Sequence, residues 1–337
     1  MALTIYDISQ KAGVSIATVS RVLNGNDKVR PATRERIMNI IEKYDYSPNT
    51  FARGMSLQSS KTIGILCTDS SDLFFAKAIY YLEQELHHLG YESLLFNTGY
   101  NVHIRKTYID LVLSEKVDGL ILVGSTFIGA TEEENRYIKE ASEKVPITIL
   151  NGFIDYPNVY SISCDDYTNM YEATSTMLQS GIKDILYLYD STMHSGMLKL
   201  DGFKAAMEQY HIPTNERLIC FFDKNIEKFR DVAAFVEAIA QTHTFHGIIT
   251  SNDFLAIGAI KYAQQNNLQI PNDLSIIGYN NSILTGCCTP ELSSIDNCLK
   301  TQCQQLIQTL FDALAGETPP QKTVIPGFLV QRGTTVF

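Results

Sequence analysis

Residues 4–24 read TIYDISQKAGVSIATVSRVLN, and this stretch predicts two short helices joined by a tight turn. Thr4 and Asp7 can cap the first helix, and Gly13 can end it. Ser15 is a favourable N-cap for the second helix. At about 100° per residue, the second helix has two unlike faces. Its packing face holds Thr18, Val19, Val22 and Leu23, and its other face holds Ile16, Ala17, Ser20 and Arg21.

The second face of this helix is suited to the major groove of DNA. In a helix-turn-helix, the first residues of the second helix reach the edges of the bases. Arg21 can donate two hydrogen bonds to guanine, and Ile16 or Ala17 can contact a thymine methyl group. An ordinary helical hairpin with a solvated Arg21 fits the same spacing, so the pattern by itself leaves both interpretations open.

The chain continues with a third helix and then a polar segment. Pro31 is a favourable first helical residue, and the spacing of the isoleucines predicts a helix that ends near Tyr44. We therefore expect an all-α helix-turn-helix head at residues 1–46. Residues 47–60 lack apolar periodicity and contain Gly54, so their composition predicts a linker.

From Lys61 onward, apolar strand-like runs alternate with helical runs. This alternation predicts right-handed βαβ units and two parallel sheets covered on both faces, which make two lobes. Ligands of open α/β sheets bind beyond the carboxyl ends of the strands, so we expect a ligand site between the lobes. The expected strands are 62–67, 93–96, 119–123, 147–150, 185–189, 218–222, 247–250 and 275–278, with helices near 74–89, 103–116, 131–143, 166–180, 196–210, 226–241 and 252–267.

The charge of the chain is unevenly distributed. The formal net charge of the 337 residues is −10, which by itself argues against DNA binding. Residues 1–60, however, hold 8 Lys+Arg against 5 Asp+Glu, and the remainder holds 19 against 32. A modestly cationic head on an acidic body fits a local DNA-binding surface, although chance unevenness would give the same small excess.

The cysteines and the apolar runs indicate in which compartment the protein is expected. The seven cysteines are scattered without CxxC pairs, so we expect reduced thiols, no structural metal and no cofactor. Vicinal Cys287 and Cys288 are a candidate oxidation-sensitive pair. No secretory signal and no run of about 20 apolar residues is visible, so we expect a cytoplasmic protein without a membrane partner.

The amino-acid sequence of the head resembles that of the lactose-repressor (LacI) family of bacterial transcription regulators. The motifs are Thr4-Ile-Tyr-Asp-Ile, Ala12-Gly-Val-Ser, Thr18-Val-Ser-Arg-Val-Leu-Asn24, Thr33-Arg-Glu-Arg-Ile and Tyr46-Ser-Pro-Asn. The resemblance implies that residues 47–60 form a hinge that becomes helical on operator DNA, with Met55 wedged into the minor groove beside Ala52. The DNA-binding residues expected on this basis are Thr4, Tyr6, Ser15, Ile16, Ala17, Thr18, Arg21, Asn49, Ala52 and Met55.

The resemblance extends over the body, and it implies two periplasmic-binding-protein-like lobes within residues 61–337. Its motifs include Val117-Asp-Gly-Leu-Ile-Leu, Asp201-Gly-Phe, Ser251-Asn-Asp and Ile277-Gly-Tyr. The chain should cross between the lobes near 160, 290 and 320. The first lobe is then expected at about 61–160 and 291–320, and the second at about 161–290 and 321–337.

The same resemblance implies an effector site in the cleft between the lobes. Its matching residues are Phe75, Asn151, Lys199, Asn252 and Asn280. Amides replace two carboxylates that are common in the family, and a lysine replaces an arginine, so we expect Lys199 to lack its usual acidic neighbours. Amides still hydrogen-bond sugar hydroxyls, so the expected effector is a sugar or sugar derivative, preferably one that carries a carboxylate or phosphate.

Four functions can be compared with this pattern. A homodimeric, effector-controlled repressor that reads a palindromic operator accounts for both the head and the body. An enzyme would need converging acid, base or nucleophile groups, and no such set is recognisable. A free sugar carrier would leave the head unexplained. An alternative keeps the head but makes a phosphocarrier protein the effector, as in regulators of carbon catabolite repression.

Overall fold

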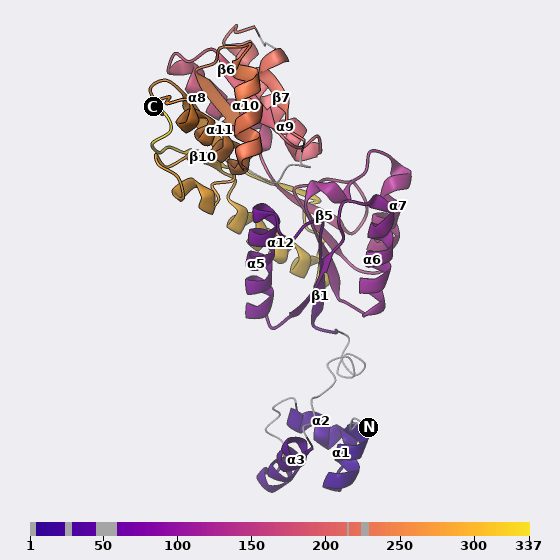
Figure 1. Cartoon of the computed structure of the whole chain (residues 1–337). Helices are drawn as coiled ribbons and strands as arrows, with labels where there is room; N and C mark the ends of the chain where they lie inside the picture. Colours follow the sequence, from indigo (N-terminus) through magenta and orange to yellow (C-terminus); the bar gives the residue numbers. More distant parts are fainter. Residues whose placement is uncertain (1–4, 24–28, 45–58, 214–215, 224–228) are drawn as a thin grey trace. The chain divides into compact units, whose positions relative to one another are not determined.

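The computed structural model describes residues 5–23, 29–44, 59–213, 216–223 and 229–337. The chain divides into two compact units, Met1–Lys61 and Thr62–Phe337 (Figure 1). Thr4, Asn49, Ala52, Met55 and the hinge segment 47–58 lie outside the described residues.

The first unit contains three short helices around a small apolar core. They are α1 (Ile5–Ala12), α2 (Ile16–Leu23) and α3 (Pro31–Lys43). The three predicted helices are confirmed because local signals fix their ends, with Pro31 as the first residue of α3. The buried side chains of this core are Ile8, Ala12, Val19, Val22 and Ile37.

The first lobe of the second unit is a parallel sheet with helices on both faces. Its strand order is β11-β5-β4-β3-β1-β2. The apolar side chains on one face of the sheet pack against α5 and α12, and those on the other face pack against α6 and α7. The strands are β1 (Thr62–Cys67), β2 (Glu92–Asn97), β3 (Gly119–Val123), β4 (Ile147–Leu150), β5 (Val159–Cys164) and β11 (Lys322–Ile325); the helices are α5 (Leu73–His88), α6 (Val102–Ser114), η1 (Ser125–Phe127), α7 (Glu132–Ser142) and α12 (Leu299–Leu314).

The second lobe repeats this architecture with one antiparallel edge strand. Its strand order is β12-β10-β9-β8-β6-β7, and β12 runs antiparallel to β10. Helices α10 and α11 cover one face, and α8 and α9 cover the other. The strands are β6 (Ile185–Tyr189), β7 (Ile219–Phe221), β8 (Gly247–Thr250), β9 (Ser275–Tyr279), β10 (Ser293–Asp296) and β12 (Phe328–Val330); the helices are α8 (Asp166–Gln179), α9 (His194–Gln209), η2 (Glu216–Leu218), α10 (Phe229–Ala240), α11 (Asp253–Gln265) and η3 (Ile283–Gly286).

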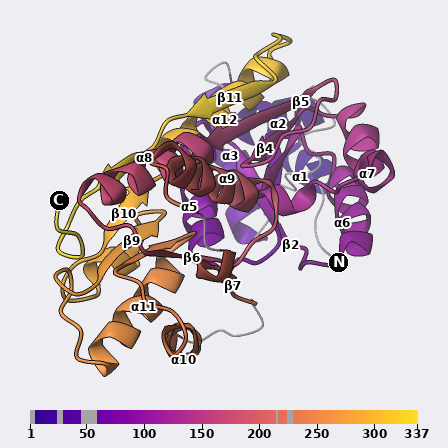
Figure 2. The same cartoon turned by 90° about the horizontal axis from the view of Figure 1, so that it is seen from above.

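The chain crosses between the lobes later than the sequence predicts. Strand β5 was assigned to the second lobe by the boundary at 160, but it pairs with β4 in the first sheet. Likewise β10 belongs to the second sheet, and β11 to the first. The crossovers therefore lie a few residues beyond the approximate positions 160, 290 and 320 expected from the sequence, because each strand completes its pairing before the chain crosses. Figure 2 shows β11 beside β5, far apart in sequence.

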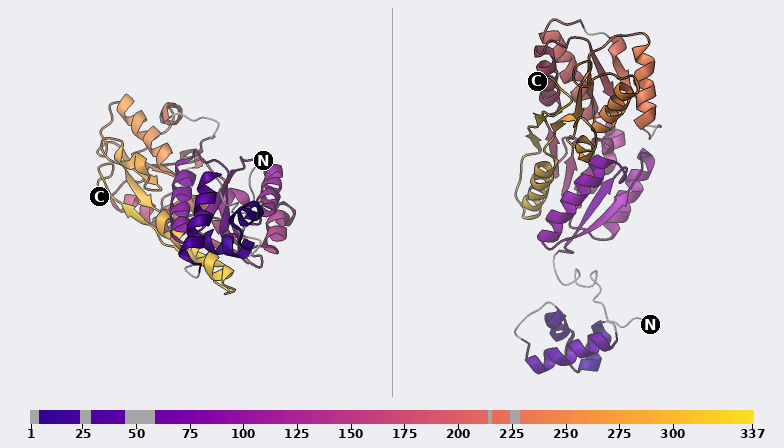
Figure 3. Two further views of the ribbon diagram at one scale, coloured as in Figure 1. Left: turned by 90° about the horizontal axis from the view of Figure 1, so that it is seen from below. Right: turned by 60° about the vertical axis from the view of Figure 1, so that its left-hand side comes forward.

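Helix α12 follows the second crossover and returns to the first lobe. It packs against α5, as Figure 3 shows for the yellow-brown and purple helices. Cys303, Leu306 and Leu310 of α12 are fully buried in the same cluster as Leu82 and Leu86 of α5. A late segment of the chain thereby completes the core of the lobe that the chain began first.

Candidate functional site

The turn between α1 and α2 is built from local hydrogen bonds. Gly13 adopts φ +63°, a left-handed conformation that ends α1 at low cost. The amide of Val14 then donates to the carbonyl oxygen of Ser9 over 3.1 Å. Ser15 Oγ accepts a hydrogen bond from the amide of Thr18 over 3.2 Å, as an N-cap should. Helix α2 therefore begins in a fixed direction relative to α1.

Helix α2 divides into the two predicted faces. Val19 and Val22 are buried against the head core, whereas Ile16, Ala17 and Arg21 are exposed. The side chain of Ile16, with a residue exposure of 38%, is an apolar group that the fold of the head does not bury. The exposed face thus combines two small or apolar side chains with one guanidinium, which suits direct contact with base edges.

The other head residues expected at DNA have different roles in the free structure. Tyr6 of α1 is 68% exposed. The hydroxyls of Ser15 and Thr18 lie 2.9 Å apart, so Ser15 is committed to the start of α2 and Thr18 to its cap. The carbonyl oxygen of Ala12 accepts a bond from Arg36 of α3 over 3.3 Å, which joins the end of α1 to the third helix.

In the second unit, polar side chains follow several strands at their carboxyl ends. Asn151 follows β4, Asp190 follows β6, Asn252 comes two residues after β8, and Asn280 follows β9. The carboxyl ends of parallel strands are the usual ligand-binding edge of an open α/β sheet. Three of the predicted effector residues, Asn151, Asn252 and Asn280, therefore lie at the edge where a ligand is expected.

Phe75 and Asn151 are positioned by the first lobe. The aromatic ring of Phe75 packs closely over Gly124, where an added Cβ would lie 2.6 Å from the ring. Gly124 also has φ +111°, so it is the residue type that the backbone and the ring both require. Asn151 has φ +58°, which asparagine tolerates well, and its Oδ1 accepts a bond from the amide of Cys164 over 3.3 Å.

The side-chain amide of Asn252 makes hydrogen bonds through both its oxygen and its nitrogen. Its Oδ1 accepts a hydrogen bond from the amide of Leu255 over 3.0 Å and caps α11. Its Nδ2 donates to Oδ2 of Asp190 over 2.8 Å, and Ser251 Oγ donates to Oδ1 of the same carboxylate over 3.1 Å. Sequence reasoning missed Asp190, although its place directly after β6 was a visible signal.

Asp190 also lies close to the first lobe. Burial and the carboxylates of Asp69 and Asp72 raise the pKa of the Tyr100 phenol, and Asp190 adds a smaller effect of the same sign. Tyr100 follows β2 of the first lobe, and Asp190 follows β6 of the second. Acidic groups from both lobes therefore raise the pKa of this tyrosine.

Lys199 of α9 is 8% exposed and lies over the face of Tyr279. Its Nζ is 3.8 Å from the ring centroid and donates to the carbonyl oxygen of Ser251 over 3.2 Å. The Tyr279 hydroxyl donates to Asp166 over 2.5 Å, and Ser251 binds Asp190. Asp166 and Asp190 are thus each one residue removed from Lys199, through Tyr279 and Ser251, and the expectation that Lys199 lacks acidic neighbours stays a prediction.

Asn280 meets a second residue that sequence reasoning missed. Asn297, just after β10, donates from Nδ2 to Oδ1 of Asn280 over 3.1 Å. Asn297 is 2% exposed, and within the described residues its own Oδ1 has no hydrogen-bond partner. Asn280 has φ +98°, so its backbone also has a conformational reason to avoid larger residues. Asn280 and Asn297 form a polar pair beside the second crossover.

Asp253 is engaged by residues of the loop after β9 and of β10. It is 2% exposed, and it accepts bonds from the Ser282 amide and from Ser294 Oγ, each over 2.6 Å. Burial raises the pKa of its carboxyl, and these hydrogen bonds act in the opposite direction. Asp253 therefore holds the loop after β9 in place.

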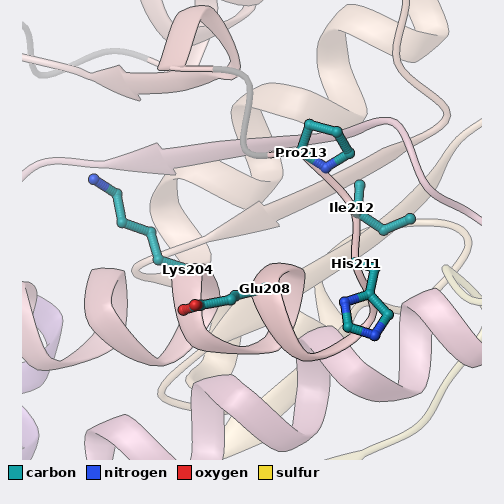
Figure 4. Close-up of a pocket in the computed structure, with 5 residues that line it drawn as sticks. All are labelled: Lys204, Glu208, His211, Ile212 and Pro213. Atoms are coloured by element: carbon teal, nitrogen blue, oxygen red, sulfur yellow. The ribbon is translucent and has the colours of Figure 1, made fainter.

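Two surface hollows lie away from these residues. One is lined by residues at the end of α9 and in the segment that follows, Lys204, Glu208, His211, Ile212 and Pro213 (Figure 4). The other lies along α7, at Glu132, Glu133, Arg136 and Lys139. Neither hollow includes a predicted effector residue.

Among the described residues, no group of three or more His, Cys, Asp or Glu side chains could hold a metal ion. Nor does any described helix combine the length and apolar character that a membrane span needs.

Comparison with known proteins identifies the family. The family model described as "Bacterial regulatory proteins, lacI family" matches residues 4–49, and the "Periplasmic binding protein-like domain" model matches residues 174–335. An HTH-type transcriptional regulator of Lachnoclostridium phytofermentans is 46% identical over 335 residues, covering 99% of this chain and 100% of the relative. The chain belongs to the lacI family of bacterial regulatory proteins.

Two further lacI-type proteins extend the comparison. Catabolite control protein A of Staphylococcus xylosus is 32% identical over 298 residues, covering 88% of this chain and 87% of the relative. The structure of a Lac repressor dimer bound to operator and the anti-inducer ONPF matches with a TM-score of 0.84 at 22% identity, covering 100% of each chain. The latter shows the fold alone. The expected lacI-family resemblance and the fold class, a helix-turn-helix head with a two-lobed α/β body, are confirmed.

Proposed function

We propose that this lacI-family protein is a homodimeric repressor that binds a palindromic operator in the cytoplasm and has no enzymatic activity. The observation that carries the proposal is the exposed face of α2, where Ile16, Ala17 and Arg21 are left outside the head core. Two such heads related by a two-fold axis would read half-sites about one helical turn apart.

The proposed division of labour at DNA follows from side-chain chemistry. Arg21 specifies guanine through two hydrogen bonds, and Ile16 and Ala17 contact thymine methyl groups. Tyr6 contributes from α1, and the Ser15–Thr18 cap fixes the angle at which α2 enters the groove. Residues 47–60 act as the hinge, with Met55 as the minor-groove wedge beside Ala52 and with Asn49 at its start. Thr4 completes the proposed set.

The proposed effector is a sugar-like molecule bound at the carboxyl ends of the strands. Asn151, Lys199 and Asn280 supply donors and acceptors that match ring hydroxyls, and Phe75 supplies an aromatic face. Asp190 joins this set, since Ser251 and Asn252 hold its carboxylate beside the carbonyl that Lys199 contacts. The side-chain amide of Asn252 donates a hydrogen bond to Asp190 in the ligand-free protein, so we assign Asn252 a positioning role.

A second candidate keeps the DNA-binding head but uses a phosphocarrier protein as the effector. The similarity to catabolite control protein A favours this alternative. The buried ammonium of Lys199 favours the small molecule instead, because a protein docked on an outer surface would not require an ammonium held by the Ser251 carbonyl oxygen over the Tyr279 ring. The two candidates differ in whether a ligand below a few hundred daltons alters operator binding.

The deciding experiment uses the full chain in two steps. Operators are first selected from a pool of random duplexes, and an enriched palindrome is expected. The selected operator is then titrated with the protein in the presence of common hexoses, pentoses, disaccharides and their phosphates, with the thermal midpoint of the protein followed in parallel. Absence of any enriched sequence would overturn the DNA-binding proposal. Enrichment with no response to any sugar, but with a response to a phosphocarrier protein, would establish the alternative.

A further inference from the structure

The three chain crossovers between the lobes meet at Gly327. This residue lies between β11 of the first sheet and β12 of the second. A Cβ added there would lie 2.5 Å from the carbonyl oxygen of Asp296, which ends β10 before the second crossover. It would also lie 2.6 Å from Nδ2 of Asn169. The backbone of the third crossover can therefore approach the other two only because position 327 is glycine.

Asn169 ties the first crossover to the third. Its Oδ1 accepts a hydrogen bond from the amide of Gly327 over 3.0 Å, and its Nδ2 donates to Sγ of Cys164 over 3.0 Å. Cys164 ends β5, the last strand before the first crossover. The amide of Asp165 adds a backbone bond to the carbonyl oxygen of Ile325 over 3.0 Å. The side chain of Asn169, on α8 and 5% exposed, is thus fully used within this junction.

Tyr279 connects this junction to the Lys199 site. Its hydroxyl lies 3.4 Å from Nδ2 of Asn169 and donates to Asp166, whose other oxygen accepts from Ser195 over 2.6 Å. The opposite end of the same side chain is the ring face under the ammonium of Lys199. A cation over the ring withdraws electron density and strengthens the phenol as a hydrogen-bond donor. A change in the position or charge of the Lys199 ammonium therefore alters the strength of the hydrogen bond that the Tyr279 hydroxyl donates.

We propose that Tyr279 and Asn169 are positioning residues that couple the Lys199 site to the crossovers, so that occupancy of the site alters the junction between the lobes. The proposal rests on the proposed effector site for its biological use. The physical coupling itself belongs to the ligand-free protein. The ammonium of Lys199 lies over the ring of Tyr279, and the hydroxyl of Tyr279 contacts Asp166 and Asn169. The side chain of Asn169 in turn hydrogen-bonds Gly327 and Cys164.

The test is a double-mutant cycle read by hydrogen–deuterium exchange on the full chain without ligand. Lys199→Met removes the ammonium but keeps a long side chain, and Tyr279→Phe removes only the hydroxyl. Exchange is measured in peptides that cover 164–166 and 325–328, with β8 as an internal reference in the second lobe. Loss of a hydrogen bond to a charged group should raise exchange in the crossover peptides by about tenfold in Tyr279→Phe. Exchange in β8 should stay unchanged.

The coupling appears as non-additivity. Lys199→Met should raise crossover exchange severalfold in the native background and have no further effect in the Tyr279→Phe background. Tyr187→Phe is the matched control, because Tyr187 is also fully buried but its hydroxyl has no hydrogen-bond partner among the described residues. In that background the full Lys199→Met effect should remain.

Two results would overturn the proposal. One is an effect of Lys199→Met that adds fully to that of Tyr279→Phe, and the other is unchanged crossover exchange in both single variants. If Tyr279→Phe raises exchange in β8 as well, Asn169→Leu takes its place in the cycle, and the same two results decide. A failure of sugars to bind would refute the proposed function but leave this cycle unaffected, so the two outcomes are distinguishable.

Discussion

The side-chain amide of Asn252 donates to Oδ2 of Asp190 over 2.8 Å while its oxygen caps α11. One side chain therefore fixes both the start of a helix and the direction of a carboxylate at the ligand-binding edge. Substitutions of Asn252 can separate the contribution of the helix cap to stability from that of the hydrogen bond to Asp190.

We expect Asn252→Ala to lower the free energy of unfolding by about 1–3 kcal/mol, because both the cap and a charge-assisted hydrogen bond are lost. Asn252→Ser should recover roughly half of the loss, since serine caps helices well but cannot reach Asp190 in the same way. Urea unfolding of the three proteins provides the comparison. Equal losses in both variants would mean that the Asp190 bond dominates and the cap contributes little.

Arg21→Ala should reduce the preference for the selected operator over a random duplex by roughly tenfold or more, because a contact with base edges carries specificity. Lys11→Ala is a charge-matched control, since Lys11 is an exposed cation on α1. The control should weaken binding to both duplexes alike. Fluorescence anisotropy at one fixed salt concentration gives both ratios, and an unchanged ratio in Arg21→Ala would remove the assignment.

Met55→Ala should weaken operator binding and reduce the bend in the DNA, because an apolar wedge in the minor groove compensates for unstacking by allowing a tighter bend. The affinity of the body for its effector should not change. A gel-shift phasing assay measures the bend, with Leu57→Ala, which also lies in the predicted hinge, as the control. Identical bends in Met55→Ala and the native protein would make Met55 an ordinary linker residue.

The charge of the effector can be tested with matched sugars. The carboxylates of Asp166 and Asp190 are each separated from Lys199 by one residue, Tyr279 or Ser251. We therefore expect a hexose to bind at least as tightly as its uronate. Isothermal calorimetry with hexose, uronate and hexose phosphate gives the order. A uronate or phosphate that binds at least tenfold more tightly, with the advantage lost in Lys199→Met, would instead restore the preference for an anionic sugar expected from sequence.

The cysteines should differ sharply in reactivity. Burial raises the pKa of the Cys164 and Cys303 thiols to about 12 and that of Cys67 to about 11, so these thiols hold almost no thiolate at pH 8. Cys287 is exposed and should react first with a chromogenic disulfide. Cys287→Ser should remove the fast phase. A fast phase that persists in this variant would contradict the assignment.

The same shifts predict the alkaline stability. Unfolded thiols ionise near their ordinary pKa of 9.0, whereas the buried ones stay protonated until a much higher pH. The unfolded state therefore releases protons first, and the free energy of unfolding should fall as the pH rises above about 9. Cys164→Ala and Cys303→Ala should each make this fall shallower.

The local features of the head could be predicted from sequence, and long-range partners could not. Gly13, Ser15 and Pro31 act through hydrogen bonds within a few residues, so their effects are visible in a short stretch. The pairing of Tyr279 with Asp166 spans 113 residues and depends on the arrangement of two strands and a helix. No periodicity carries that information.

The candidate effector residues illustrate the same limit. Sequence reasoning placed Asn151, Asn252 and Asn280 at the carboxyl ends of strands, because strand ends follow from apolar runs, whereas Lys199 lies within α9. It did not find Asp190 or Asn297, whose roles depend on contacts with Asn252 and Asn280. It also missed β5 as a strand, since Ser161 and Ser163 interrupt its apolar pattern although the strand is largely buried.

The late position of β11 and β12 bears on synthesis of the protein. The ribosome must reach Ile325 before the first sheet has its last strand, and Val330 before the second sheet has its own. The three head helices are complete by Lys43, so the head can fold while both lobes are still unfinished. During that interval a nascent chain carries a folded DNA-reading surface without the body that controls it. A ribosome stalled late in the message would therefore release a polypeptide whose head is intact and whose regulation is absent.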